Sequence, residues 1–325
     1  MLSHLESATS WQRSFVGPFY LAAFFFISGY LTKYENFGKL IYKKFRGLFI
    51  PWFVFGLFNI LLSQILSFNV HRNVFDEIVT FLLQMGGGSG IWFLAALFIA
   101  FIPFWLFVHL YETSNSWHKL FLFVLVPFLF SLASHIYKEF FDPTWLPWNA
   151  QNVDLPWHLD YIFIAVFYMV LGYIFKNTKL ESVFDCWNTR IIRIGIVVVY
   201  FVLLIASYGC YGFLKIAYIY PKSLCGIMAL VMICKKYHLN KYTAFVGANT
   251  LIYFALHGKC YSVIQFLLKK FAHNFYEQAL SNQFSSALLA IVITIILSVM
   301  LILPAMFINK YLPFVIGKAP SKRTD

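Results

Sequence analysis

The chain has 325 residues, of which 61% are hydrophobic, 21% aromatic and only 12% charged. Because soluble domains carry roughly a quarter charged residues, this composition excludes a water-exposed globular domain and predicts an all-α, polytopic bundle of transmembrane helices. The net charge of +12 is typical of membrane proteins that keep basic loops in the cytoplasm, and the absence of an arginine-rich arm argues against nucleic acid as a partner.

Nine apolar segments are predicted to cross the bilayer, because each approaches the roughly 20 residues that a spanning helix needs. They cover residues 17–32, 47–68, 91–111, 119–136, 159–175, 191–209, 213–234, 247–268 and 285–309. A further apolar segment, 74–85, contains Asp76 and Glu77 and is interpreted as a short interfacial or re-entrant piece. Residues 1–325 show no separate soluble domain and no internal repeat, which disfavours transporter folds built from duplicated halves.

The orientation follows from the lysines and arginines, which concentrate in cytoplasmic loops. If the loop 33–46 is cytoplasmic and the spans alternate from there, the C-terminus is cytoplasmic and the N-terminus lies outside. The inner loops then hold 17 of the 25 basic residues: Lys33, Lys39, Lys43, Lys44, Arg46, Lys119, Lys176, Lys179, Arg190, Arg193, Lys235, Lys236, Lys241, Lys310, Lys318, Lys322 and Arg323. We expect an integral protein of a bacterial inner (plasma) membrane, and the polar start, Met1 to Gln12, predicts no cleavable signal peptide.

A basic amphipathic segment follows the first predicted span. Helical pitch predicts two opposite faces, an apolar one of Phe37, Ile41, Phe45 and Leu48 and a cationic one of Lys39, Lys43 and Arg46. Lys44 falls near the apolar face, where its long stem can still reach water. Two interpretations remain open: the cations anchor the segment on inner-leaflet membrane lipid, or they grip the phosphates of a nucleotide-like cofactor.

Five stretches occur in an order that resembles a known family. They are Ala23-Phe-Phe-Phe-Ile-Ser-Gly-Tyr-Leu31, Lys43-Lys-Phe-Arg-Gly-Leu-Phe-Ile-Pro-Trp52, Ile91-Trp-Phe-Leu-Ala-Ala-Leu-Phe98, Leu155-Pro-Trp-His-Leu-Asp160 leading into Phe167-Tyr-Met-Val-Leu-Gly-Tyr173, and Gly247-Ala-Asn-Thr-Leu-Ile-Tyr-Phe-Ala-Leu-His257. Together they resemble the membrane-bound acyltransferase-3 superfamily, in particular its branch of sugar O-acetylases of the fucose 4-O-acetylase type.

The resemblance implies an acyl-CoA-dependent enzyme of about ten helices. It would move an acetyl group from acetyl-CoA to a hydroxyl of an extracytoplasmic or lipid-linked cell-envelope glycan. In this family a first helix ends in a catalytic histidine shortly before the FFxxSGY helix, and the matching position is His4. The helix expected before His4 is missing from the sequence, so we expect about nine spans.

Acyl transfer from a thioester needs a base for the acceptor hydroxyl, and histidine suits this role because it titrates near neutrality. His4, by its match to the family, and His257 are the candidates. His257 lies in the middle of a span, where polar groups are costly and often functional; a helix–helix hydrogen bond is the alternative. The resemblance also assigns Lys39, Lys43 and Arg46 to the CoA phosphates.

The acceptor is assigned to Trp157, Asp160 and Trp92. Asp160 would hydrogen-bond a sugar hydroxyl while the Trp157 indole stacks on the ring; an aromatic belt and a helix N-cap are the alternatives. Ser28 and Gly29 are small enough to allow two helices to approach closely. The five cysteines show no metal-ligand spacing, and no metal is expected.

Two other functions remain open. A glycan or lipid transporter would usually show acidic residues within its spans or internal repeats, whereas the acids here lie almost entirely in predicted loops. A catalytically inactive membrane scaffold is favoured only by the missing helix.

The charge bias yields a test of topology. A cysteine placed at Ser321 should not react with a membrane-impermeant thiol reagent in intact cells, because the basic C-terminal tail is predicted to be cytoplasmic. The same cysteine should react once the cells are permeabilised. Labelling in intact cells would reverse the assignment.

Overall fold

The structure is a computed structural model that describes residues 5–66, 73–83, 91–113, 119–141, 155–237 and 240–318. Within these ranges the chain is helical and contains no strand, so the all-α prediction is confirmed. The helices are α1 (Ser10–Tyr30), α2 (Phe37–Lys44), η2 (Phe45–Phe49), α3 (Ile50–Leu66), α4 (Val74–Leu83), α5 (Trp92–Thr113), α6 (Lys119–Phe140), η5 (Pro156–His158), α7 (Leu159–Asn177), α8 (Leu180–Trp187), α9 (Arg190–Ala206), α10 (Gly212–Lys236), α11 (Lys241–Ala248), α12 (Thr250–Phe271), α13 (His273–Ser281), α14 (Gln283–Met300), α15 (Ile302–Tyr311) and η6 (Pro313–Ile316).

Seven helical stretches in these described ranges are long and apolar enough to cross a membrane. They are Phe37–Ile65, Trp92–Thr113, Phe121–Phe140, Pro156–Asn177, Gly212–Lys236, Thr250–Phe271 and Gln283–Tyr311. An eighth crossing results if α8 and α9, which are bent by 100° to each other, form one broken span. The nine predicted spans all overlap helices, but α1 is not among these stretches, because the polar Gln12 and Arg13 in its first turn lower its hydropathy.

The closest helix pair is α1 with α7, and two glycines make it so. A Cβ atom added to Gly29 would lie 1.9 Å from the carbonyl oxygen of Met169, and one added to Gly172 would lie 1.9 Å from the carbonyl oxygen of Phe26. The missing side chains let the two backbones touch, as small residues do between membrane helices. The close approach expected at Gly29 is therefore present.

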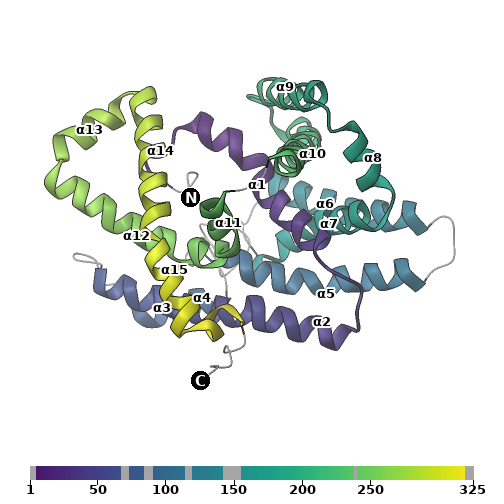
Figure 1. Cartoon of the computed structure of the whole chain (residues 1–325), viewed down its shortest axis with the longest axis horizontal. Coiled ribbons are helices and arrows are strands. Elements are labelled where there is room, and N and C mark those ends of the chain that lie inside the picture. Colours follow the sequence, from purple (N-terminus) through teal and green to yellow (C-terminus); the bar gives the residue numbers. More distant parts are fainter. Residues whose placement is uncertain are drawn as a thin grey trace.

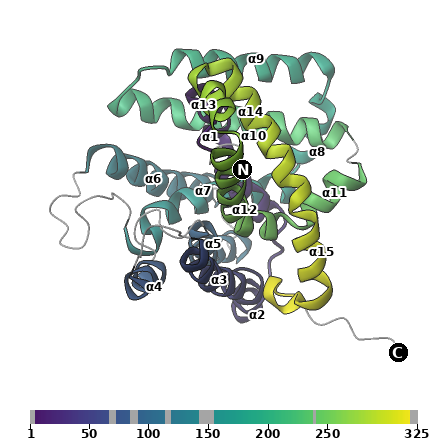
Figure 2. The ribbon, with the colours of Figure 1, turned by 90° about the vertical axis from the view of Figure 1, so that its left-hand side faces the viewer.

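Two groups of helices meet at α5. In the first, α1, α5, α6, α7 and α10 share one buried apolar core. In the second, α3, α5, α12 and α15 share another. Figure 1 shows the second group toward the left and the first toward the right, with α14 and α15 forming one long rod. In the turned view of Figure 2, α2, α3 and α5 lie together beneath the rest of the bundle.

Polar side chains near the ends of different spans contact one another as the predicted alternation of the spans requires. Among ends predicted to be inside, Glu181 accepts hydrogen bonds from both Tyr30 and Lys235. Among ends predicted to be outside, Lys138 Nζ lies 2.5 Å from Asp160 Oδ2. The structure thus brings inner ends to inner ends and outer ends to outer ends.

The predicted piece at 74–85 forms α4, a ten-residue helix. Its Phe81 is buried and packs on α3 where Gly56 leaves room, because a Cβ atom on Gly56 would lie 2.0 Å from the Phe81 ring. α4 is too short to cross a bilayer. This agrees with the interpretation as an interfacial or re-entrant piece.

The glycine contact predicts a stability effect. Replacing Gly172 with alanine should lower the free energy of unfolding by about 1–3 kcal/mol, the usual cost of overpacking, because the new methyl group meets the backbone of α1 rather than a movable side chain. Thermal unfolding in detergent, followed by circular dichroism, measures the change. Gly195→Ala is the control, since a Cβ atom there meets nothing within 4 Å. Equal stability of the two variants would contradict the close contact.

Candidate active site

Three cavities lie in a row among α1 to α5 and α12. The first, the basic cavity, has a volume of about 380 Å³ and lies where the chain passes from α1 to α2. The second, the apolar cavity, has about 460 Å³ and lies between α1, α5 and α12. The third, the polar cavity, has about 590 Å³ and lies between α3, α4 and α12.

Neighbouring cavities share wall residues. Ser28, Leu48 and Leu97 line both the basic and the apolar cavity. Phe254 and His257 line both the apolar and the polar cavity. Each cavity therefore borders the next through these shared residues, and the apolar cavity lies between the other two.

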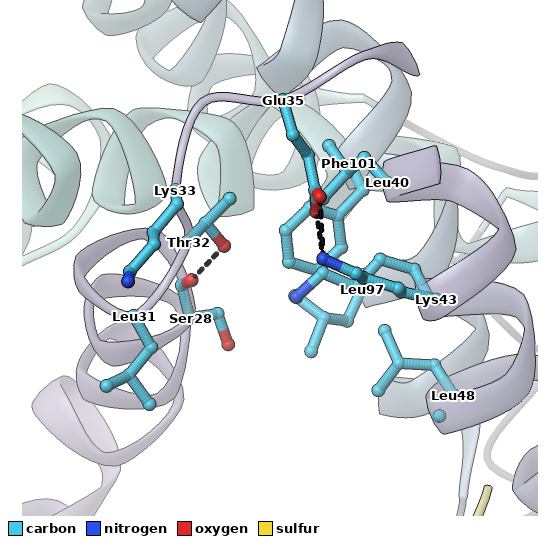
Figure 3. Close-up of a pocket in the computed structure, with 12 residues that line it drawn as sticks. Ser28, Leu31, Thr32, Lys33, Glu35, Leu40, Lys43, Leu48, Leu97 and Phe101 are labelled. Carbon is cyan, nitrogen blue, oxygen red and sulfur yellow. Dashed lines mark hydrogen bonds and ion pairs between the residues drawn. The ribbon is translucent and has the colours of Figure 1, made fainter. Parts of the chain in front are cut away.

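Figure 3 shows the wall of the basic cavity, with Lys33, Glu35 and Lys43 around it. Lys43 Nζ lies 2.6 Å from Glu35 Oε2. The indole Nε1 of Trp105 donates to the carbonyl of Glu35 at 2.9 Å, which fixes the loop that carries this carboxylate. Lys43 is thus the only one of the three predicted phosphate ligands in the wall of this cavity.

Lys44 is a further cation in the same wall, and it is half-buried. Its ammonium lies 4.0 Å from the centre of the Phe101 ring. Throughout the described ranges it forms neither an ion pair nor a hydrogen bond. The wall of this cavity thus contains three lysines, Lys33, Lys43 and Lys44, and one carboxylate, that of Glu35, and this surplus of positive charge favours an anion.

The inward side of this segment lies beside its predicted apolar face, where Lys44 was expected. Leu40 is buried and Lys44 lines the cavity, so the inward face runs through these two residues, while Phe37 and Phe45 are 39% and 41% exposed. In a bilayer, apolar side chains are stable against lipid, so a polar face can turn inward.

A π-helical turn also affects which side chains of this segment face the cavity. η2 follows α2 without a break and widens one turn of the helix, which rotates everything after it relative to α2. Arg46 lies in this turn, outside the cavity wall, with its guanidinium over the ring of Tyr42. Lys39 also lies outside the wall, and its side chain is 68% exposed.

His257 stands between the apolar and the polar cavity. It is buried, and its Nδ1 lies 2.7 Å from the carbonyl oxygen of Phe254 on the preceding turn. A carbonyl oxygen can only accept a hydrogen bond, so Nδ1 carries the proton. In the neutral imidazole, Nε2 is therefore the nitrogen that takes up a proton, which is the requirement for a base.

Hydrogen-bonding side chains from three helices line the polar cavity. Lys259 Nζ donates to Ser63 Oγ at 2.7 Å, and Asn59 Nδ2 donates to the carbonyl of Ala255 at 3.1 Å. Glu77 accepts a hydrogen bond from Gln64 at 3.1 Å. The cavity thus offers amide, hydroxyl, ammonium and carboxylate groups, a set that suits a ligand rich in hydroxyls.

The three predicted acceptor residues lie together but line none of these cavities. Asp160 is buried; one oxygen pairs with Lys138 and the other accepts from the main-chain N–H of Leu155 at 3.1 Å. Trp157 packs on the Trp52 ring at 5.2 Å between centroids. Trp92 packs on His158 at 4.4 Å. Asp160 therefore ties the segment before α7 to Lys138 of α6, and it lies in the first turn of α7 rather than at the N-cap, which is His158.

The turn that carries these residues has an unusual backbone. Trp157 and His158 both have positive φ angles, of 57° and 50°. Bulky residues rarely adopt this left-handed conformation, and each costs on the order of 1–3 kcal/mol. Burial of His158 against Trp92 and the Asp160 contacts hold the turn in place.

His4 lies outside the described residues. The first described segment packs on α12, because the main-chain N–H of Glu6 donates to the hydroxyl of Tyr261 at 2.9 Å. Leu5 is buried in a cluster with Tyr261 and Tyr276.

Sequence reasoning missed several residues of the site. The sequence assigned Lys44 to the apolar side, and it did not single out Asn59 or Ser63. A usable signal was present: Asn59 and Ser63 are spaced four residues apart in a largely apolar span, so they share a helix face. Polar side chains on one face of a membrane helix point toward the bundle interior rather than lipid.

The comparisons with known proteins identify one family. A family model described as an acyltransferase domain matches residues 2–303, which is most of the chain. Among curated proteins and solved structures, none matches this chain.

Proposed function

The chain belongs to the acyltransferase-3 family and is a membrane acyltransferase, and we propose that it is an O-acetyltransferase. The donor is acetyl-CoA, and the acceptor is a hydroxyl of an extracytoplasmic or lipid-linked glycan. One observation carries the proposal: His257 forms part of the wall of both the apolar and the polar cavity. A base in that position serves a donor on one side and an acceptor on the other.

The phosphates of acetyl-CoA are assigned to the basic cavity. Lys43 and Lys44 line it, and ammonium groups provide strong charge-assisted hydrogen bonds to phosphate oxygens. Lys44 fits this role best, because within the described chain it forms no hydrogen bond or ion pair and its ammonium lies over the face of Phe101. Lys39 and Arg46, predicted for the same role, lie on the same helical stretch and add to the positive field around the cavity.

The apolar cavity suits the uncharged arm that links the phosphates of acetyl-CoA to its thioester. It begins beside the basic cavity at Ser28 and reaches His257. At 1.5 Å per residue, His257 lies roughly 10 Å along α12 from Thr250, which also lines this cavity. The thioester would thus meet the histidine inside the bundle, away from water.

The chemical step places His257 as general base and acid. Its Nε2 takes the proton of the acceptor hydroxyl while that oxygen forms a bond to the carbonyl carbon of the acetyl group. The same proton then passes to the CoA sulfur as the carbon–sulfur bond breaks. The products are an acetyl ester and free CoA thiol, and the imidazole returns to its starting state.

The polar cavity is assigned to the acceptor. Asn59, Ser63 and Glu77 provide donors and acceptors for hydroxyl groups, and no single charge dominates the wall. Because acetyl-CoA is made in the cytoplasm, the basic cavity, the loop 33–46 and the C-terminus are assigned to the cytoplasmic side of a bacterial inner membrane. The polar cavity then belongs to the opposite side, where the glycan acceptor is available.

The donor assignment predicts a binding defect. Lys44→Met should weaken the binding of CoA by about ten- to hundredfold, since a charge-assisted hydrogen bond contributes about 1.5–3 kcal/mol. Titration calorimetry of the purified protein with CoA measures it. Lys39→Met is the control, and we expect its Kd to change by about threefold or less because the side chain is exposed. A larger effect of Lys39→Met than of Lys44→Met would return the phosphates to the predicted cationic face that contains Lys39.

The base assignment predicts a loss of turnover. His257→Ala should lower acetyl transfer by about 10²–10⁴-fold, the usual contribution of a general base, with CoA binding nearly unchanged. Transfer is measured as label incorporated from acetyl-labelled acetyl-CoA into membrane glycan. His4, the base implied by the family resemblance, is the second candidate. If His4→Ala abolishes transfer while His257→Ala remains active, the base is His4 and the role of His257 is structural.

A further inference from the structure

Five side chains with a polar hydrogen line the apolar cavity: Tyr20, Ser28, Thr250, Tyr253 and His257. The rest of its wall is hydrocarbon. An acyl transfer in this cavity needs more than a base, because negative charge develops on the carbonyl oxygen as the acceptor attacks. Main-chain N–H groups cannot serve beyond the first turn of each helix, since they are bonded within the helix. Along the middle of these helices, the donor to that oxygen is therefore a side chain.

Four of the five polar hydrogens already have a main-chain acceptor. Ser28 Oγ donates to the carbonyl of Phe24 at 2.8 Å, and Thr250 Oγ1 donates to that of Gly247 at 2.7 Å. The hydroxyl of Tyr253 donates to the carbonyl of Ser298 at 2.9 Å. His257 Nδ1 donates to the carbonyl of Phe254 at 2.7 Å. None of these groups can turn to a substrate without giving up a bond in a poorly solvated interior.

Tyr20 is different. It is half-buried on α1, and its hydroxyl has no hydrogen-bond acceptor anywhere in the described chain. It lies eight residues, roughly 12 Å along the helix, from Ser28, where the apolar cavity adjoins the basic one. Tyr20 and His257 both lie well along the cavity from its basic end, on the two helices that face each other across it.

We propose that the Tyr20 hydroxyl donates a hydrogen bond to the carbonyl oxygen of the acyl group and stabilises the oxyanion formed during transfer. This inference rests on the proposed acyl transfer in the apolar cavity. As the acceptor oxygen bonds to the carbonyl carbon, the carbon–oxygen π electrons move to the oxygen, and Tyr20 keeps its proton while donating to it. When the carbon–sulfur bond breaks, the carbonyl re-forms and the hydroxyl is unchanged. Tyr20 is thus a catalytic residue that exchanges no proton.

The test compares Tyr20→Phe with wild type in the full chain. Release of CoA thiol from acetyl-CoA is followed in membranes that retain their glycans. We expect kcat to fall by about 10²–10³-fold, the usual effect of removing one oxyanion donor, while KM for acetyl-CoA stays nearly constant because the ring remains. The acid limb of the pH–rate profile should persist in Tyr20→Phe, since the base is untouched.

Tyr200→Phe is the matched control. The Tyr200 hydroxyl also contacts α1, where it donates to the carbonyl of Phe15, but Tyr200 lines none of the three cavities. We expect this variant to lose thermal stability and to keep its kcat. The proposal is overturned if Tyr20→Phe keeps the kcat of wild type, or if its loss of kcat is matched by Tyr200→Phe at equal loss of stability.

Failure of the underlying function gives a different result. If His4→Ala and His257→Ala both turn over acetyl-CoA like wild type, the proposed mechanism fails whatever Tyr20→Phe does. If wild type turns over no acetyl-CoA, both proposals are overturned. If His257→Ala is inactive and Tyr20→Phe is fully active, only the role of Tyr20 is lost.

Discussion

The backbone contact between α1 and α7 is the constraint on which the rest of the arrangement depends. Gly29 and Gly172 remove the side chains that would hold the two helices apart, and the pair shares one apolar core with α5, α6 and α10. Ser28, adjacent to Gly29, lies in the wall between the basic and the apolar cavity. The contact that fixes α1 in the bundle therefore also fixes one wall of the candidate site.

In a lipid environment, the penalty for exposure falls on polar side chains rather than on apolar ones. Outward-facing apolar residues such as Phe37 and Phe45 are stable against hydrocarbon, so there is no penalty for leaving them at the surface. Polar groups carry the penalty, and they gather inside: Lys44 over Phe101, Lys259 on Ser63 and His257 on its own helix. In this protein the interior polar groups, rather than the interior apolar ones, mark the candidate site.

A row of three cavities with different chemistry fits the proposed reaction. A large anionic donor cannot easily cross a bilayer, because burying its charge is costly. In the proposed arrangement its phosphates stay in the basic cavity, and only an uncharged arm enters the apolar one. His257 then links this arm to the polar cavity. In this proposal Tyr20 completes the chemistry with a side-chain hydrogen bond to the carbonyl oxygen of the acyl group.

The sequence by itself determined the membrane class, the approximate positions of the long apolar helices and, through five short stretches, the acyltransferase family. The length of an apolar segment and the residues of a family motif are local properties of the sequence, so both can be recognised without a structure. It also suggested Lys43 and His257. Only the tertiary structure decided that Lys44 turns inward, that Asp160 is held by Lys138 and Leu155, and that His257 borders two cavities. Those facts depend on which helices meet and on how each helix is rotated about its own axis. The π-helical turn and the glycine contacts set these rotations through packing between segments that are distant in the sequence.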